Sequence, residues 1–322
     1  MAATIKNQNF GVEIEMNNMS RYKAQKIVAD ALGSTQTGYS SSYDNHYVID
    51  TKGRQWKCES DSSIKNVGRG TCELVTPVLQ YEDIETLQKV IRALRADGAK
   101  TDSSCGIHIH VDGANHTPKS LRTMLKFFVG RQDLIYDALD NNSRSSSWCL
   151  KMPQSLLTAM NNERDLSKGR LEEIWYSPAN TSRCGKYHGG IDHRHYNETR
   201  YHGMNLHAFF TKGTVEFRLF NSTLHAGKVK AYIQFCLALS AWAISAQDSR
   251  VTFRSMDGYT AEKKVNLMYH VLTNRLGLYG DEFATCRLHM MTIIKKNAGI
   301  NQRHLIYRKA DLSALYGGKD KE

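Results

Sequence analysis

The sequence predicts an α+β fold in which one face of a sheet carries polar side chains and helices pack on the other face. Residues 10–15 (FGVEIE), 106–111 (GIHIHV) and 215–220 (VEFRLF) alternate polar with apolar residues, which is typical of half-buried strands. Residues 117–139 and 227–247 instead carry apolar side chains at helical spacing. Because alternate residues of a strand share a face, we expect the helices to cover the apolar face of the sheet.

The strands are expected to be short and separated by turn residues. Gly53 marks a hairpin turn, and Pro77 ends a strand because proline lacks the N–H that a sheet requires. A second hairpin is expected around residues 211–214. In chain order, the predicted strands cover residues 10–16, 47–49, 55–58, 74–75, 106–111, 206–210 and 215–220.

The helices are expected at positions where apolar residues recur every three or four residues. Thr117 followed by Pro118 is a typical helix start, because the Thr side chain can cap the first turn and proline fits its first position. Asp97-Gly98 is a typical helix end. The predicted helices cover residues 21–32, 81–94, 117–139 and 227–247, and no motif is recognised beyond residue 275.

Composition limits the classes of protein without choosing between them. A formal net charge of +11 favours polyanionic partners such as nucleic acid, nucleotides or an acidic polymer, although a merely soluble basic surface would give the same value. Seven cysteines without a CxxC pair indicate reduced thiols, and we expect a cytoplasmic protein. No apolar run is long enough to cross a membrane. An oligomer is compatible with the sequence.

The polar face of the predicted sheet has the composition of a metal-centred enzyme site. Glu13 and Glu15 share one strand face, and His108 and His110 share another. Several carboxylates with an imidazole suit hard divalent ions such as Mg²⁺ or Mn²⁺. Arg218 lies two residues after Glu216 in the last of these strands, and an arginine beside metal ligands is useful when a phosphate bridges it to the metal. The combination indicates phosphoryl transfer from a nucleotide.

These segments, taken in order, resemble the "putative amidoligase" family of carboxylate–amine ligases, which are related to glutamine synthetase and glutamate–cysteine ligase. The resemblance spans roughly residues 8–225 and depends on the order and spacing of its pieces. It implies a glutamine synthetase-like curved antiparallel sheet that carries the active site on one face. The matching pieces are FGVEIE (10–15), WKCESDSSI (56–64), CELVTP (72–77), CGIHIHV (105–111), RYHGMN (200–205) and EFRLF (216–220).

The resemblance also implies a reaction and a set of roles. ATP would phosphorylate a substrate carboxylate, and an amine would then attack the acyl phosphate; neither substrate is identified. Ser62 stands where the family usually has glycine, which weakens the assignment of its neighbour Asp61. The implied metal ligands for Mg²⁺ or Mn²⁺ are Glu13, Glu15, Glu73, His108 and Glu216; the implied nucleotide contacts are His108, His110, Arg200, Asn205 and Arg218; and the implied catalytic residues are Arg218, Arg200 and Asp61.

The chain is long enough for one large domain or two closely packed ones. We expect residues 1–228 to form the ligase core and residues 229–322 to form a helical C-terminal part packed on it. The segment at about 141–200 is polar and rich in turn residues, and its later part is dense in Arg, His, Tyr and Gly. Such a segment in a compact enzyme is usually a functional lid or a disordered excursion, and we interpret it as a lid over the substrate.

Two other classes of function remain open. A metal-dependent hydrolase of the His-x-His type would need further histidine ligands, which residues 188, 193, 195 and 202 offer, but it leaves the Glu-x-Glu pair and Arg218 without a role. A basic nucleic-acid-binding protein on a repurposed ligase fold would explain the charge, with tyrosines interleaved among arginines at 183–200. It does not explain carboxylates gathered on a sheet face.

Overall fold

The structure is a computed structural model, and it describes residues 3–141, 147–180, 190–246 and 258–300. An antiparallel sheet of eight strands runs through this part of the chain in the order β2-β3-β4-β5-β1-β6-β8-β7. The predicted mixed α+β class is therefore confirmed. The strands are β1 (Phe10–Asn17), β2 (Thr37–Ser40), β3 (Asn45–Ile49), β4 (Gln55–Glu59), β5 (Thr71–Val75), β6 (Gly106–Asp112), β7 (Met204–Asn205) and β8 (Thr214–Asn221).

The strand register brings the polar positions of distant segments together. On β1, Glu13 pairs with His108 of β6, and Glu15 pairs with Glu73 of β5. On the other side of β6, Glu216 pairs with His110. Paired residues of an antiparallel sheet point to the same face, so all of these side chains share one face.

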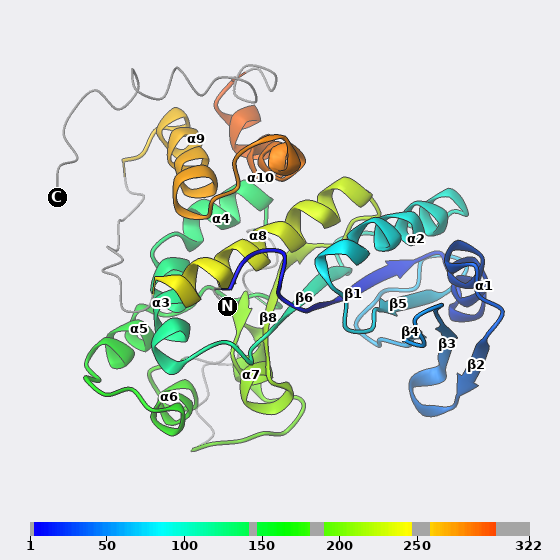
Figure 1. Cartoon of the computed structure of the whole chain (residues 1–322), viewed down its shortest axis with the longest axis horizontal. Coiled ribbons are helices and arrows are strands. Elements are labelled where there is room, and N and C mark those ends of the chain that lie inside the picture. The colour runs from blue at the N-terminus through cyan, green and yellow to red at the C-terminus, as the bar shows by residue number, and fades with distance from the viewer. Residues whose placement is uncertain (1–2, 142–146, 181–189, 247–257, 301–322) are drawn as a thin grey trace.

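Helices cover the opposite, apolar face of the sheet (Figure 1). Ile14, Ile107 and Ile109 have no exposed surface there and belong to the main hydrophobic core. The described helices are α1 (Arg21–Leu32), α2 (Ile84–Ala96), α3 (Pro118–Val129), α4 (Gln132–Leu139), α5 (Gln154–Asn161), α6 (Lys168–Trp175), α7 (His207–Lys212), α8 (Ala226–Ser245), α9 (Ala261–His270) and α10 (Ala284–Asn297). No helix in the described ranges is long and apolar enough to cross a membrane.

Three predicted elements differ in the structure. The strand expected at 206–210 is wrong, because the short helix α7 occupies residues 207–212. The hairpin expected around residues 211–214 is therefore also wrong, since these residues join a helix to β8. The side chain of Asn205 accepts a hydrogen bond from the His207 N–H over 2.8 Å, and Gly213 ends the helix in a left-handed conformation. The single helix expected at 117–139 is divided into α3 and α4, which meet at Gly130 and Arg131.

The polar segment after residue 141 is largely helical where it is described. α5 packs on α3, and α6 packs on α5. Leu156 and Leu171 are buried on these helices, as is Trp175. This part of the segment therefore belongs to the packed body of the protein, whereas residues 142–146 and 181–189 of the expected lid lie outside the described residues.

Candidate active site

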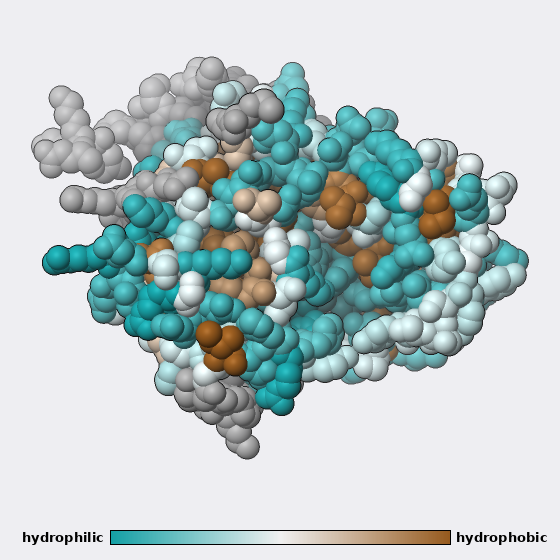
Figure 2. All heavy atoms as spheres, turned by 60° about the horizontal axis from the view of Figure 1, so that its bottom comes forward, coloured by the Kyte–Doolittle hydropathy of each residue, from teal (hydrophilic) through white to brown (hydrophobic). Residues whose placement is uncertain are grey.

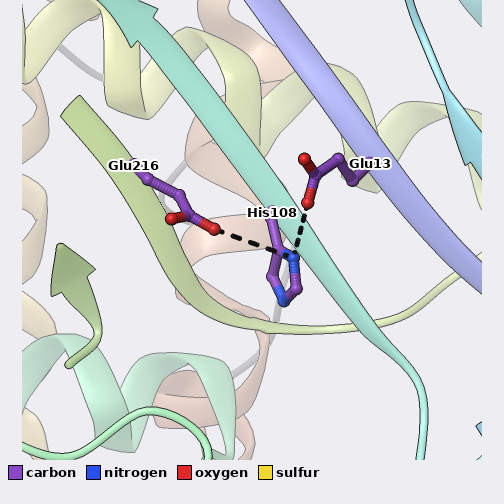
Figure 3. Close-up of side chains that lie close together, drawn as sticks. All are labelled: Glu13, His108 and Glu216. Carbon is purple, nitrogen blue, oxygen red and sulfur yellow. Dashed lines mark hydrogen bonds and ion pairs between the residues drawn. The ribbon is translucent and has the colours of Figure 1, made fainter. Parts of the chain in front are cut away.

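Three side chains from three adjacent strands meet on the polar face of the sheet (Figure 3). Nδ1 of His108 lies 2.9 Å from Oε2 of Glu13 and 3.8 Å from Oε1 of Glu216. One potential ligand atom from each residue lies within 4.8 Å of the others. Carboxylate and imidazole groups at this spacing can share one divalent cation.

A second group adjoins the first and shares His108 with it. Glu15, Glu73 and His108 also place one potential ligand atom each within 4.8 Å of the others. The backbone N–H of Gly106 donates a 2.6 Å hydrogen bond to Oε2 of Glu15 and holds this carboxylate in place. Glu73 makes no hydrogen bond or ion pair with any described residue. Glu73 therefore lies beside a second carboxylate without a group that compensates its charge. A cation bound between the two carboxylates would compensate that charge.

His110 lies next to the first group and is held by a threonine. Its Nε2 is 3.2 Å from Oε1 of Glu13 and 3.8 Å from Oε1 of Glu216. Its Nδ1 is 2.9 Å from the hydroxyl of Thr214, the first residue of β8. The contact with Thr214 fixes the orientation of the ring relative to the carboxylates.

Arg218 and Asn205 converge on Glu216 from opposite sides of its carboxylate. Nη1 of Arg218 donates to Oε1 over 2.6 Å, and Nδ2 of Asn205 donates to Oε2 over 2.6 Å. Arg218 is almost fully buried, with 6% of its surface exposed, and its Nε has no hydrogen-bond partner among the described residues. A buried guanidinium with a spare N–H is suited to a further anion, such as a phosphoryl oxygen.

The cluster carboxylates differ in their electrostatic surroundings: Glu13 and Glu216 lie beside cationic or imidazole groups, whereas Glu73 lies beside other carboxylates. Burial alone would raise the pKa of Glu216, but the Arg218 guanidinium and the histidines hold it well below its usual range. Burial likewise opposes ionisation of Glu13, yet His110 and His108 keep its pKa well below the usual value. In contrast, burial raises the pKa of Glu73 well above its usual value, and the neighbouring carboxylates raise it further.

The other two expected catalytic residues lie near this cluster but do not contact it. The guanidinium of Arg200 lies 5.7 Å from the ring centre of Tyr201, and that of Arg218 lies 5.9 Å from the same ring. The ring of Tyr201 thus lies close to both guanidinium groups. Asp61 accepts a hydrogen bond from the Ser63 N–H and adds to the negative field at Glu73. Within the described residues, no hydrogen bond or ion pair links Arg200 or Asp61 to a cluster glutamate.

A cavity of about 430 Å³ opens directly beside the carboxylate cluster. Glu13 and His110 form its inner wall, Pro77 and Val78 form an apolar side, and Lys212 provides a cation. Figure 2 shows the molecule from the side of the polar face, where the surface is mainly hydrophilic and hollowed near its middle. A ligand in this cavity would contact the cluster with one end and apolar side chains with the other.

Sequence reasoning missed three groups that support the cluster. These are the hydroxyl of Thr214, the N–H of Gly106 and the ring of Tyr201. Thr214 and Gly106 each begin a strand that carries cluster residues, so their position in those strands was an available signal. Tyr201 directly follows Arg200 in the RYHGMN segment, but only the fold shows that it also lies beside Arg218.

The protein has a mixed α+β fold whose antiparallel sheet gathers acidic and imidazole side chains on one face, and this donor set can hold divalent cations. Comparison with protein families identifies it further. The model of the family described as "putative amidoligase enzyme" matches residues 6–240, which include every strand of the sheet and all the cluster residues. The chain belongs to this family, whose name denotes ligases that form amide bonds. A comparison with curated proteins gave no match.

Proposed function

We propose that the protein is an ATP-dependent carboxylate–amine ligase that works through an acyl phosphate. The observation that carries the proposal is the composition of the cluster: carboxylates in excess of their cations, together with a buried arginine that has a spare N–H donor. Carboxylates that need cations and a guanidinium that needs an anion are both satisfied by a nucleotide phosphate with divalent metal. The proposal includes a glutamine synthetase-like arrangement of the sheet.

Mg²⁺ or Mn²⁺ fits the donor set because oxygen ligands predominate and no described cysteine belongs to either group of potential ligands. Glu13, His108 and Glu216 would hold one ion, and Glu15 and Glu73 with the shared His108 would hold another. Bound divalent ions would supply positive charge that neutralises the phosphates of ATP. Asn205 acts through Glu216 as a positioning residue, because it fixes the orientation of that carboxylate.

The proposed reaction has two steps that balance. An oxygen of the substrate carboxylate attacks the γ-phosphorus of ATP, the bond to the β-phosphate oxygen breaks, and ADP leaves. The amine then attacks the acyl carbon, a C–N bond forms, the C–O bond to phosphate breaks, and the amine gives up a proton. Arg218 would stabilise the charge on the phosphoryl group, Arg200 would bind phosphate at the outer side of Tyr201, and Asp61 would receive the proton or orient the amine.

The cavity beside Glu13 and His110 is our proposed site for the nucleoside part of ATP. Its volume of about 430 Å³ lies in the range of small-molecule sites. Its apolar wall suits a base, and Lys212 can approach a phosphate. His110, between the cavity and Glu216, would contact the nucleotide near its phosphates.

The decisive experiment measures ADP release with Mg²⁺, with and without pooled amino acids, amines and acidic acceptors, and follows the products by mass. Acceptor-dependent ADP with a product that equals two substrates less one water would establish the ligase. Glu15→Gln is expected to abolish turnover while the fold survives. The matched control is Glu85→Gln on the exposed side of α2. Near-full activity of Glu15→Gln would contradict the metal assignment.

The histidines that a hydrolase would need do not join the cluster where they are described. His202 is fully buried, with its ring centre 5.9 Å from that of Trp175. Nε2 of His193 contacts Oε1 of Glu172 over 2.6 Å, away from the sheet. His195 forms no hydrogen bond or ion pair with a cluster glutamate among the described residues, and residue 188 lies outside them. The site therefore favours the ligase over the hydrolase.

A further inference from the structure

A second and larger cavity lies on the helical side of the protein, away from the carboxylate cluster. Its volume is about 770 Å³, and it is formed where α2 and the N-terminal end of α8 approach the start of α10. α2 and α8 lie next to each other on the side of the sheet that the helices cover (Figure 1). No residue of the proposed active site lines this cavity. The lining residues are Gln88, Arg92, Arg95, Ala96, Leu224, His225, Ala226, Gly227, Lys230 and Thr285.

The charge of the cavity is entirely positive. Arg92 and Arg95 extend from α2, and Lys230 faces them from α8. No carboxylate lines the cavity, and within the described residues none of the three cations forms an ion pair. Elsewhere on the surface, lysines and arginines commonly pair with acids, as Lys23 does with Asp97 at 2.8 Å. Unpaired cations that face one another across a hollow repel, and an anion between them removes that repulsion.

The wall formed by α8 adds neutral donors and close access to the backbone. α8 begins at Ala226, so the first N–H groups of a long helix face this end of the cavity. Gly227 leaves the backbone bare: a Cβ there would lie 3.1 Å from the rings of both His225 and His289. Thr285 contributes a hydroxyl from the first turn of α10.

The wall is also held rigidly in place. Nε2 of Gln88 donates a 3.0 Å hydrogen bond to the carbonyl of Ala226, which ties α2 to the start of α8. The backbone positions of the two arginines, four and seven residues after Gln88, are therefore fixed relative to the N-terminal end of α8. A site built on packed helices needs little rearrangement when it binds a ligand.

We propose that this cavity is a binding site for a small phosphate-bearing ligand of nucleotide size, separate from the active site. Two guanidinium groups, one ammonium group and helix N–H donors match the oxygens of a phosphate or polyphosphate. The volume exceeds that of a bare phosphate, and Leu224 and Ala96 provide apolar surface for the rest of a ligand. The three cations gather around one hollow, which favours a small ligand over a nucleic-acid backbone, because a backbone binds extended basic surfaces.

The test is calorimetric titration of the full chain with inorganic tripolyphosphate in the presence of EDTA. Without divalent metal, the carboxylates of the active site repel the probe, so binding reports the cavity. Arg92→Gln with Arg95→Gln is expected to weaken binding by about 100-fold, because each charge-assisted contact is worth about tenfold or more. Both arginines are exposed, and neither has a hydrogen-bond or ion-pair partner in the described residues, so the fold should survive.

The matched control removes the same charge from the same two helices outside the cavity, with Lys89→Gln and Lys228→Gln. This variant should bind within about threefold of the wild type. Glu15→Gln should bind as well as the wild type, which separates this proposal from that of the ligase. Absence of binding by the wild type would overturn the inference, as would equal weakening in the control. The inference would also be overturned if a single-stranded oligonucleotide bound through these arginines and tripolyphosphate did not.

Discussion

Glu73→Gln should make the metal-free protein more stable, although it removes a side chain from the site. Glu73 faces Glu15 directly across the β1–β5 pair and has no hydrogen bond or ion pair with any described residue. Burial, and then the neighbouring carboxylates, raise the pKa of Glu73 well above its usual value because they disfavour its charge. Glutamine keeps the shape of the side chain and removes that charge.

The magnitude follows from the spacing of the two carboxylates. Their potential ligand atoms lie within 4.8 Å of each other. At an effective dielectric constant of about 20, two unit charges at this distance repel by about 3.5 kcal/mol. Partial protonation and the remaining solvent exposure of Glu73 reduce this value, so we expect a gain of about 1–2 kcal/mol in the free energy of unfolding at pH 7.5.

The assay is urea unfolding of wild type and variant in EDTA and again in Mg²⁺. Mg²⁺ should stabilise the wild type, because a ligand that binds only the folded state shifts the equilibrium toward it. Glu73→Gln should begin more stable in EDTA and gain much less from Mg²⁺. Glu85→Gln, which removes an exposed carboxylate, should change stability by no more than about 0.5 kcal/mol. The reasoning fails if Glu73→Gln is less stable than the wild type in EDTA, or if it keeps the full stabilisation by Mg²⁺.

Three other substitutions test separate parts of the structure. Gly203→Ala should destabilise the protein by about 1–3 kcal/mol in urea unfolding, because a Cβ there would lie against the buried hydroxyl of Tyr136; an unchanged midpoint would contradict this packing. Arg218→Met should cost about 3–5 kcal/mol in EDTA, because it leaves Glu216 buried without its guanidinium partner, and a neutral effect would show that the pair is solvated. Burial lowers the pKa of His116 from 6.5 to about 4. As the pH falls, His116 is protonated in the unfolded chain before it is protonated in the folded one, so the folded state loses stability between about pH 6.5 and about pH 4. This loss should amount to roughly 3 kcal/mol and become smaller in His116→Gln; an identical pH dependence in wild type and variant would exclude His116 as its source.

Alternation along the strands was sufficient to predict which side chains share a face, because the period of a strand is fixed by backbone geometry. It was not sufficient to predict which strands are neighbours. β1 lies between β5 and β6, segments that lie far from it in the sequence, and only this order places Glu13 opposite His108 and Glu15 opposite Glu73. The order is a property of the whole sheet and has no local signal.

Two of the helices that the sequence did not indicate, α10 and α7, lack a simple apolar stripe. α10 buries Met290 and Ile294, but it also buries Arg287 and Lys295, so burial on this helix does not follow hydrophobicity. α7 has six residues; the side chain of Asn205 accepts a hydrogen bond from the N–H of its first residue, His207, and Gly213 ends the helix. In both cases tertiary contacts and capping decide the structure, and neither is visible as periodicity.

The unequal charge balance across the site explains why Glu73, and not Glu13, is the informative residue for the effect of metal. On the β8 side, Glu13 and Glu216 already have Arg218 and the two histidines as close partners, so this part of the cluster holds together without added cations. Removing Glu13 would take away the carboxylate closest to both buried histidines and would destabilise the protein whether or not a metal binds there. On the β5 side, no described hydrogen bond or ion pair compensates Glu73. The charge of Glu73 therefore destabilises the folded protein until a cation is present. If Glu73→Gln both raises the stability in EDTA and removes the stabilisation by Mg²⁺, Glu73 binds metal and does not merely support the structure.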